Sequence, residues 1–158
     1  MKKELLRPLT QDVLKEVRNM VGQARHAALA VLEVSTGFPA VSRVALATLE
    51  NGTPMLLTSE LAPHTAGLRQ SKNCSLLIGQ VGKGDAMAHP RATLFCIATS
   101  LAPSRRQEMR ERFLMHHPKA INYIDLPDFG FWQLDVERVS YNAGFGKAFA
   151  ISGTDFIQ

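Results

Sequence analysis

The sequence predicts a mainly-β fold of the α+β class, a small antiparallel β-barrel with peripheral helices. Most of its apolar runs are short and joined by hairpin signals, and the helical patterns are few. Alternating βαβ units would instead place a helical pattern after nearly every strand. With 158 residues, 46% of them hydrophobic and 20% charged, the chain is expected to form a single domain over residues 1–158.

Helices are expected in three places. The first covers residues 10–24, with Thr10 as its N-cap and an apolar stripe at helical spacing. The second covers residues 62–71 and has Pro63 in its first turn, where the missing N–H costs nothing. The third covers residues 104–116 and begins with a Ser-x-x-Gln capping box. Residues 1–25 are therefore expected to form an N-terminal helical segment, and residues 26–155 a barrel with appended helices.

Strands account for most of the remaining chain. The continuous run of small apolar residues at 27–34 predicts a strand that is buried on both faces. Asn51-Gly52 lies between two apolar runs and predicts a hairpin, because this dipeptide accepts the positive φ angles of a tight turn. The further strands are expected at residues 41–49, 55–58, 75–81, 91–101, 129–136, 139–143 and 147–151.

The positive charge of the chain is divided between segments. The sequence pI is about 9.3, but residues 1–25 carry six Lys/Arg against three acids and residues 104–122 carry five against two. Residues 123–158 reverse the sign, with two against five. No helix-turn-helix, zinc finger or aromatic RNA-binding motif accompanies this charge. We therefore expect solvated helix faces and no nucleic-acid partner.

Other segments bear on compartment and redox state. No apolar run approaches the roughly 20 residues of a membrane span, and the basic N-terminus lacks the apolar core of a signal peptide. The two cysteines, Cys74 and Cys96, lie in apolar strand-like runs and are expected to be buried reduced thiols, with a disulfide as the alternative. We expect a cytoplasmic protein that does not bind membranes.

Motifs for metal and nucleophile chemistry are absent from the sequence. His116 and His117 are adjacent, so on a helix they point about 100° apart and cannot share a metal. There is no cysteine pair at zinc spacing, no nucleophile elbow, no Gly-x-Gly-x-x-Gly after a strand and no Walker loop. No metal site is expected, and no catalytic residue is identified.

Arg43 is the strongest single candidate for ligand binding. It lies in the middle of a predicted strand, where a buried charge must be paired or must face a ligand. An Arg fork matches a phosphate group with two parallel hydrogen bonds. The alternative is an Arg at a sheet edge that pairs with Glu33 or Glu60.

Two further segments carry polar groups at strand ends. Thr58-Ser59 ends one strand and His64-Thr65 begins the next helix, so hydroxyls lie beside a helix N-terminus, which attracts anions. Ordinary helix capping explains the hydroxyls equally well. Arg91 and Thr93 begin the long strand at 91–101, and Arg91 could instead pair with Asp85.

In order and spacing, the segments 38–44, 56–65 and 90–94 resemble the FMN-binding split-barrel family, which includes pyridoxamine 5′-phosphate oxidase and haem-utilisation relatives. The segment 144–148 resembles the Gly-Phe-Gly-Arg-Ala signature of the haem-utilisation branch, with Lys147 in place of Arg. A tight bend between strands explains its glycines equally well. The resemblance covers about residues 26–155.

This resemblance implies a split-barrel homodimer with FMN at the subunit interface, acting as an oxidoreductase on a small organic substrate. The flavin itself would supply the redox chemistry. The implied phosphate ligands are Arg43 and His64. Hydroxyl or backbone contacts are implied for Val44, Thr58, Ser59, Thr65 and Thr93, and Arg91 is implied as an auxiliary cation.

Departures from the family pattern leave alternatives open. The C-terminus lacks the substrate-gripping Arg-x-His of the vitamin-B6 oxidase, so oxidation of pyridoxine phosphate is not expected. The last histidine is His117, so the tail histidine that ligates iron in haem-degrading members is absent, and Gly67 stands where the branch often has Asn. A deazaflavin could replace FMN. The chain could also bind haem without flavin, or be a non-catalytic barrel dimer; an iron ligand could come only from His26, His64, His89, His116 or His117.

Overall fold

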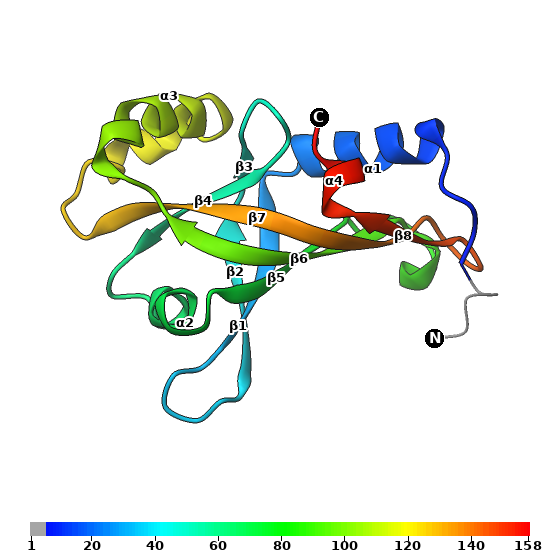
Figure 1. Cartoon of the computed structure of the whole chain (residues 1–158), viewed down its shortest axis with the longest axis horizontal. Coiled ribbons are helices and arrows are strands. Elements are labelled where there is room, and N and C mark those ends of the chain that lie inside the picture. Colours follow the sequence, from blue (N-terminus) through cyan, green and yellow to red (C-terminus); the bar gives the residue numbers. More distant parts are fainter. Residues whose placement is uncertain (1–5) are drawn as a thin grey trace.

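The computed structural model describes residues 6–158, in which eight strands form one antiparallel sheet. Along this sheet the order is β2-β1-β5-β6-β7-β4-β3, and β8 pairs with β7. The predicted mainly-β fold, an antiparallel barrel with peripheral helices, is confirmed (Figure 1). The strands are β1 (His26–Leu32), β2 (Pro39–Ala45), β3 (Ala47–Thr48), β4 (Pro54–Ser59), β5 (Asn73–Ile78), β6 (Arg91–Ser100), β7 (Phe129–Asn142) and β8 (Ala148–Ser152).

The sheet curls because one stretch of chain belongs to both of its ends. β2 and β3 are the two ends of the strand order, yet a single residue, Leu46, separates them in sequence. Leu46 is fully buried, and its N–H donates to the Arg25 carbonyl at 3.0 Å. The strand expected at 41–49 is therefore two strands that meet at a bend. The hairpin expected at Asn51-Gly52 joins β3 to β4, and Gly52 has φ +89°.

In β1, β5 and β6 one face of the sheet packs on the core and the other is open. In β1 the even-numbered residues are half-buried or exposed and the odd-numbered ones are buried, as in a strand with one solvated face. The expectation that this strand is buried on both faces is wrong. The strand pairings align one row of residues across the open face, which we call the outer face. In strand order from β2 to β8 this row contains Arg43, Ala28, Leu77, Thr93, Ser140 and Ala150.

The helices confirm two expected starts and correct a third. Thr10 caps α1 (Gln11–Gln23) by accepting from the Val13 N–H at 3.3 Å, and α2 (Pro63–Ser71) begins at the expected proline. Ser104, however, lies inside a 3-10 turn, η3 (Pro103–Arg105), and α3 (Arg106–His116) has no side-chain cap. The expected capping box is wrong because Pro103 starts a tighter turn one residue earlier. The other 3-10 turns are η2 (Ala86–Ala88) and η4 (Pro118–Asn122).

The C-terminal part of the chain differs most from the expected elements. β7 is one strand of 14 residues where two strands were expected. The pairing with β6 shifts register between Phe95 and Cys96, so Glu137 is an extra residue on β7, a bulge that keeps the strand continuous. A short helix, α4 (Gly153–Phe156), follows β8; Arg18 of α1 holds it by donating to the Phe156 carbonyl at 2.7 Å. Figure 1 shows α1 and α4 side by side.

The buried residues form two hydrophobic clusters. The larger cluster lies between α1 and the inner face of β1, β5, β6 and the second half of β7, with Leu29, Leu76 and Leu94 fully buried. A smaller cluster fills the space under α3 and η4, and its members are Ala47, Met55, Met109, Phe113, Ala120, Ile124 and Phe131. Among residues 6–158, no helix is both long enough and apolar enough to span a bilayer.

Candidate cofactor-binding site

β2 divides the predicted site residues between two faces of the sheet. Successive side chains of a strand point to opposite sides, so Ser42 and Val44 face the inside of the barrel and Arg43 faces outwards. His64 contacts the inner Ser42 and Thr65 bonds the Ser59 carbonyl, whereas Arg43 and Thr93 share one row of the outer face. The eight predicted residues are thus not brought together at one point: Val44, Thr58, Ser59, His64 and Thr65 lie on β2, at the end of β4 and at the start of α2, Arg43 and Thr93 lie three strands apart, and Arg91 begins β6. Their assignment to a cofactor stays a prediction.

The hydroxyls of the inner group already have protein partners. Thr58 is buried, and its Oγ1 accepts from the Trp132 indole N–H at 3.0 Å. Ser59 Oγ donates to Asp128 Oδ2 at 2.7 Å, and Thr65 Oγ1 donates to the Ser59 carbonyl at 2.6 Å. A phosphate at Ser59 would meet the Asp128 carboxylate, which disfavours a second negative charge. Helix capping, the alternative reading of these hydroxyls, is wrong, because the N-cap of α2 is Ala62 and no side chain caps the helix; the three hydroxyls bond elsewhere in the protein.

His64 connects α2 to β2. Its Nδ1 lies 3.2 Å from Ser42 Oγ, and burial lowers the pKa of its imidazole from the ordinary value of 6.5. The N-cap of α2 is Ala62, which has no side chain to bond the first free N–H groups of the helix. The free N–H groups at the start of α2 can therefore bind an anion. The histidine beside them loses its proton more readily than an exposed histidine does.

The position of α2 depends on Gly67. A Cβ at this residue would lie 2.9 Å from Val31 Cγ2 and 3.0 Å from the Leu32 carbonyl oxygen, both on β1. The helix thus packs on β1 more closely than any larger residue would permit. This close packing is the structural reason for a glycine at the position where the related branch often has Asn.

Arg43 is exposed on the outer face rather than buried as its strand position suggested. Neither alternative partner takes its charge, because Glu60 pairs with Arg69 and Glu33 accepts from Thr36. Within residues 6–158 the guanidinium of Arg43 has no carboxylate in ion-pair range. The guanidinium is therefore free to bind an anionic ligand.

Arg91 bonds to the backbone of the loop before its strand. Its Nη1 donates to the Met87 carbonyl at 3.0 Å and to the His89 carbonyl at 3.3 Å. Asp85, the expected alternative partner, instead accepts from the Met87 N–H at 2.8 Å. Thr93, two residues further on β6, lies three strands away from Arg43 in the same row, about 14 Å at ordinary strand spacing.

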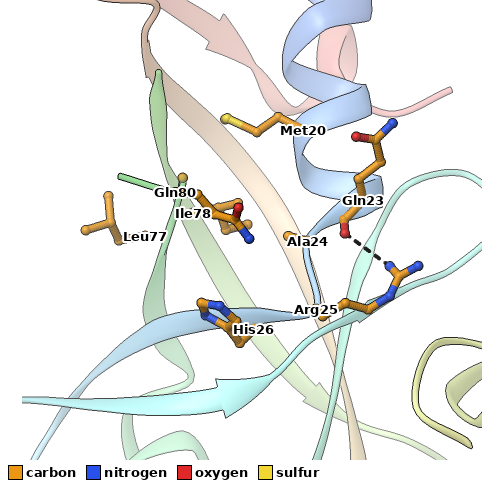
Figure 2. A pocket seen from close by; sticks show the side chains of 9 residues that line it. Met20, Gln23, Ala24, Arg25, His26, Leu77, Ile78 and Gln80 are labelled. Carbon is orange, nitrogen blue, oxygen red and sulfur yellow. Dashed lines mark hydrogen bonds between the residues drawn. The ribbon is translucent and has the colours of Figure 1, made fainter. Parts of the chain in front are cut away.

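Two adjoining hollows open at the start of β1. One is a cavity of about 290 Å³ between the end of α1 and β5; the other, of about 340 Å³, lies on the outer face beside Arg43. His26, Leu77 and Gly79 line both of them. Figure 2 shows the His26 imidazole at the start of β1 in the first hollow, with Met20 on the opposite, helical side. In the sequence, His26 stood out only as one of five possible iron ligands. Its two-residue spacing from Ala28 and Ala30 was a signal that all three lie on the same face of the strand.

A separate groove runs past the only tryptophan of the chain. Arg69 lies over the Trp132 ring at 5.5 Å, and both line adjoining hollows of about 180 and 400 Å³ between α2 and the end of β6. Trp132 itself is 4% exposed and belongs to the large cluster. Trp132 is therefore a core residue, and Arg69 covers its ring.

The turn between β7 and β8 contains the Gly-Phe-Gly-Lys segment. Gly144 and Gly146 have φ +133° and +68°, and Phe145 at the tip is exposed. The Asn142 side chain accepts from the Gly144 N–H at 2.9 Å, and the Ala143 N–H donates to the Lys147 carbonyl at 2.9 Å. These bonds close a tight bend between strands, which is the explanation of the two glycines that needs no family signature.

The curled antiparallel sheet, whose end strands β2 and β3 are joined only through Leu46, is that of a split β-barrel. A family model for the CREG β-barrel matches residues 8–158, and the chain belongs to this family. The fold and relationship expected from the sequence, an FMN-binding split barrel of the pyridoxamine 5′-phosphate oxidase type with haem-utilisation relatives, are confirmed.

Known relatives include proteins named for haem. The chloroplastic heme oxygenase HOZ of Arabidopsis thaliana is 34% identical over 117 residues, which are 74% of this chain and 36% of HOZ. A heme binding protein from Mycobacterium smegmatis has 28% identity and a TM-score of 0.83, covering 96% of this chain and 61% of that one. Another solved chain, of nearly equal length, has 38% identity and a TM-score of 0.86, covering 96% and 99%. The chain spans about a third of the length of the curated relative it matches.

Proposed function

We propose that this protein binds haem on the outer face of its sheet, beside Arg43. The observation that carries the proposal is the free guanidinium of Arg43 at the edge of a flat surface made of small and apolar side chains. Ala28 and Leu77 follow Arg43 in one row, and Leu77 is 49% exposed although apolar. The haem-related names of HOZ and of the mycobacterial protein support the same ligand class.

The residues present fit the chemistry of a porphyrin. Its flat apolar ring gains from contact with apolar side chains and its two propionates gain from cations, which is the usual composition of a cofactor site. Ala28, Leu77 and Gly79 would lie under the ring, and Arg43 would bind a propionate. A bound haem would supply redox and oxygen chemistry, while the chain would supply binding and orientation.

A haemin titration of the full chain tests this proposal. We expect saturable binding with a Soret band, and we expect Arg43→Ala to weaken binding about 10- to 100-fold, as the loss of one charge-assisted contact does. Lys119→Ala is the matched control, because Lys119 is an exposed cation on η4, outside the outer face. Equal affinities of the two variants would exclude Arg43 from the site, and no saturable binding by the natural chain would overturn the proposal.

FMN is the second candidate, and the uncapped start of α2 favours it. The free N–H groups beside His64 suit a phosphate, and His64 bonds Ser42 on the strand that carries Arg43. In this case the protein would be an oxidoreductase acting on a small substrate. A flavin titration separates the two ligands: saturable quenching of FMN fluorescence, weakened about 10- to 100-fold in His64→Ala, would support the flavoprotein. A deazaflavin can be titrated in the same way, and a response to none of the three ligands would favour the non-catalytic barrel.

We further propose a homodimer in which a second copy covers the outer face. An antiparallel sheet facing water normally carries polar side chains there, whereas Val41 is 68% exposed and Leu77 lies in the middle of the face. Analytical ultracentrifugation should give twice the monomer mass, and Leu77→Asp should shift it to the monomer. Met115→Asp, at an exposed apolar residue of α3, is the control and should leave the dimer intact. A monomeric natural chain would refute this arrangement.

The cytoplasm remains our proposed compartment. Cys74 and Cys96 are both free and buried, the state that a reducing compartment maintains. The relative HOZ is named as chloroplastic, so fractionation of cells that express the tagged chain is the direct test.

A further inference from the structure

His26 differs from the other four histidines in its bonding. His64 bonds Ser42, His89 bonds the Lys83 carbonyl at 2.9 Å, His116 bonds the Arg112 carbonyl at 3.1 Å and His117 bonds the Leu46 carbonyl at 2.7 Å. His26 is exposed, and within residues 6–158 neither of its ring nitrogens has a hydrogen-bond partner. Each of the other four keeps one open ring nitrogen, whereas His26 keeps both and lines the hollows beside Arg43.

The surroundings of His26 leave room for a flat ligand. His26 lines both hollows at the start of β1, together with Leu77 and Gly79 (Figure 2). Gly79 has φ +146°, and a Cβ there would lie 2.6 Å from the Pro90 carbonyl oxygen, so this position in the lining of both hollows is restricted to glycine. Small residues, Ala24 on one side and Ala28 on the other, complete the surface.

Cations lie at a distance from His26 that suits the edge of the same ligand. His26 pairs with Ala45 across β1 and β2, so Arg43 is its diagonal neighbour, about 7–8 Å away in such sheets. Arg25 lines the first hollow and donates to the Gln23 carbonyl at 3.2 Å. Arg43 is therefore the cation that lies within reach of a propionate of a porphyrin placed over His26, whereas Arg25 is already bonded to Gln23.

We infer that the His26 imidazole would bind the iron of a bound haem and that Arg43 would bind a propionate. This inference rests on the proposed haem binding and assigns its iron ligand, which the sequence left open. Imidazole nitrogen is a common ligand of haem iron, and ligation needs a ring nitrogen that no protein group occupies. His26 meets that condition on the face where Arg43 lies.

Haemin titrations of the full chain and its variants test the assignment. We expect His26→Ala to weaken haemin binding at least about 10- to 100-fold, because losing a ligand costs at least as much as losing an outer-shell partner. The iron–imidazole stretching band in the resonance Raman spectrum of the ferrous complex should disappear. Added imidazole should restore a nitrogen-ligated spectrum in His26→Ala. His89→Ala is the matched control and should behave as the natural chain does.

The outcomes separate this inference from the function on which it rests. Haemin binding by the natural chain with an unchanged Raman band in His26→Ala would overturn the ligand assignment and leave haem binding intact. No saturable haemin binding by the natural chain would overturn both. Urea unfolding of each variant shows whether it is folded. His26→Gln keeps a polar side chain of similar length at this exposed strand start, so it tests the loss of haemin affinity in a second variant.

Discussion

Gly67 offers a direct test of how closely α2 packs on β1. Replacing it with Ala adds one methyl group, which would lie 2.9 Å from Val31 Cγ2 and 3.0 Å from a backbone carbonyl. The side-chain methyl can give way by a few tenths of an ångström, whereas the carbonyl belongs to the sheet. The methyl group therefore has to push the helix outwards.

The expected magnitude comes from two opposing effects. Overpacking a well-packed site costs about 1–3 kcal/mol, and Ala in place of a helical Gly gains about 0.5–1 kcal/mol. Gly22 in α1 supplies the matched control, because nothing lies within 4 Å of a Cβ there. We expect Gly67→Ala to lower the free energy of unfolding by about 1–2 kcal/mol and Gly22→Ala to raise it by about 0.5–1 kcal/mol.

Urea unfolding followed by far-ultraviolet circular dichroism measures both variants. With a slope of about 2 kcal/mol per molar urea, a difference of about 2 kcal/mol between them separates their midpoints by about 1 M. If Gly67→Ala proved as stabilising as Gly22→Ala, the space between α2 and β1 would be larger than the structure gives, and the reasoning would fail.

Three further predictions concern side chains already described. Burial lowers the pKa of His64 and of His116, so the folded state binds fewer protons than the unfolded chain, and the free energy of unfolding should fall as pH drops from about 7.5 to 5. His64→Gln should flatten this dependence; an unchanged slope would contradict it. Trp132→Phe should lower the free energy of unfolding in urea by about 1–3 kcal/mol, because Thr58 loses its indole donor. An unchanged free energy would show that this hydrogen bond does not stabilise the fold. Burial raises the pKa of Cys74 to about 12, so both thiols should resist a thiol reagent until urea is added; fast native labelling would argue against their burial.

Local sequence signals predicted the elements wherever local chemistry decides them. Thr10, Pro63 and Asn51-Gly52 mark helix starts and a hairpin through their own backbone preferences, and the structure has all three. The bend at Leu46 could not be found in this way, because Leu46 is an apolar residue in an extended run and only the closure of the sheet turns it. The bulge at Glu137 likewise depends on pairing with β6, a partner 40 residues away in sequence.

The predicted site was limited by the same distinction. Arg43 was identified as a cation for a ligand, but the expectation that its side chain is buried was wrong. The position of α1 decides which face of β1 and β2 is covered. Ser59 and Thr65 were identified by residue type, yet only the fold reveals that Asp128 accepts a hydrogen bond from the Ser59 hydroxyl. His26 lacked any motif, and its place became clear only when the end of α1, β1 and β5 were seen together (Figure 2).

The division of the core into two clusters has a consequence for motion. The outer face lies on the reverse of β1, β5 and β6, whose inner side chains belong to the larger cluster, so amide hydrogens in these strands should exchange only when the whole molecule unfolds. α3 and η4 rest on the smaller cluster of seven buried residues and can open as a unit of their own. The surface on which we place the ligand would then stay rigid while the opposite end of the barrel opens and closes.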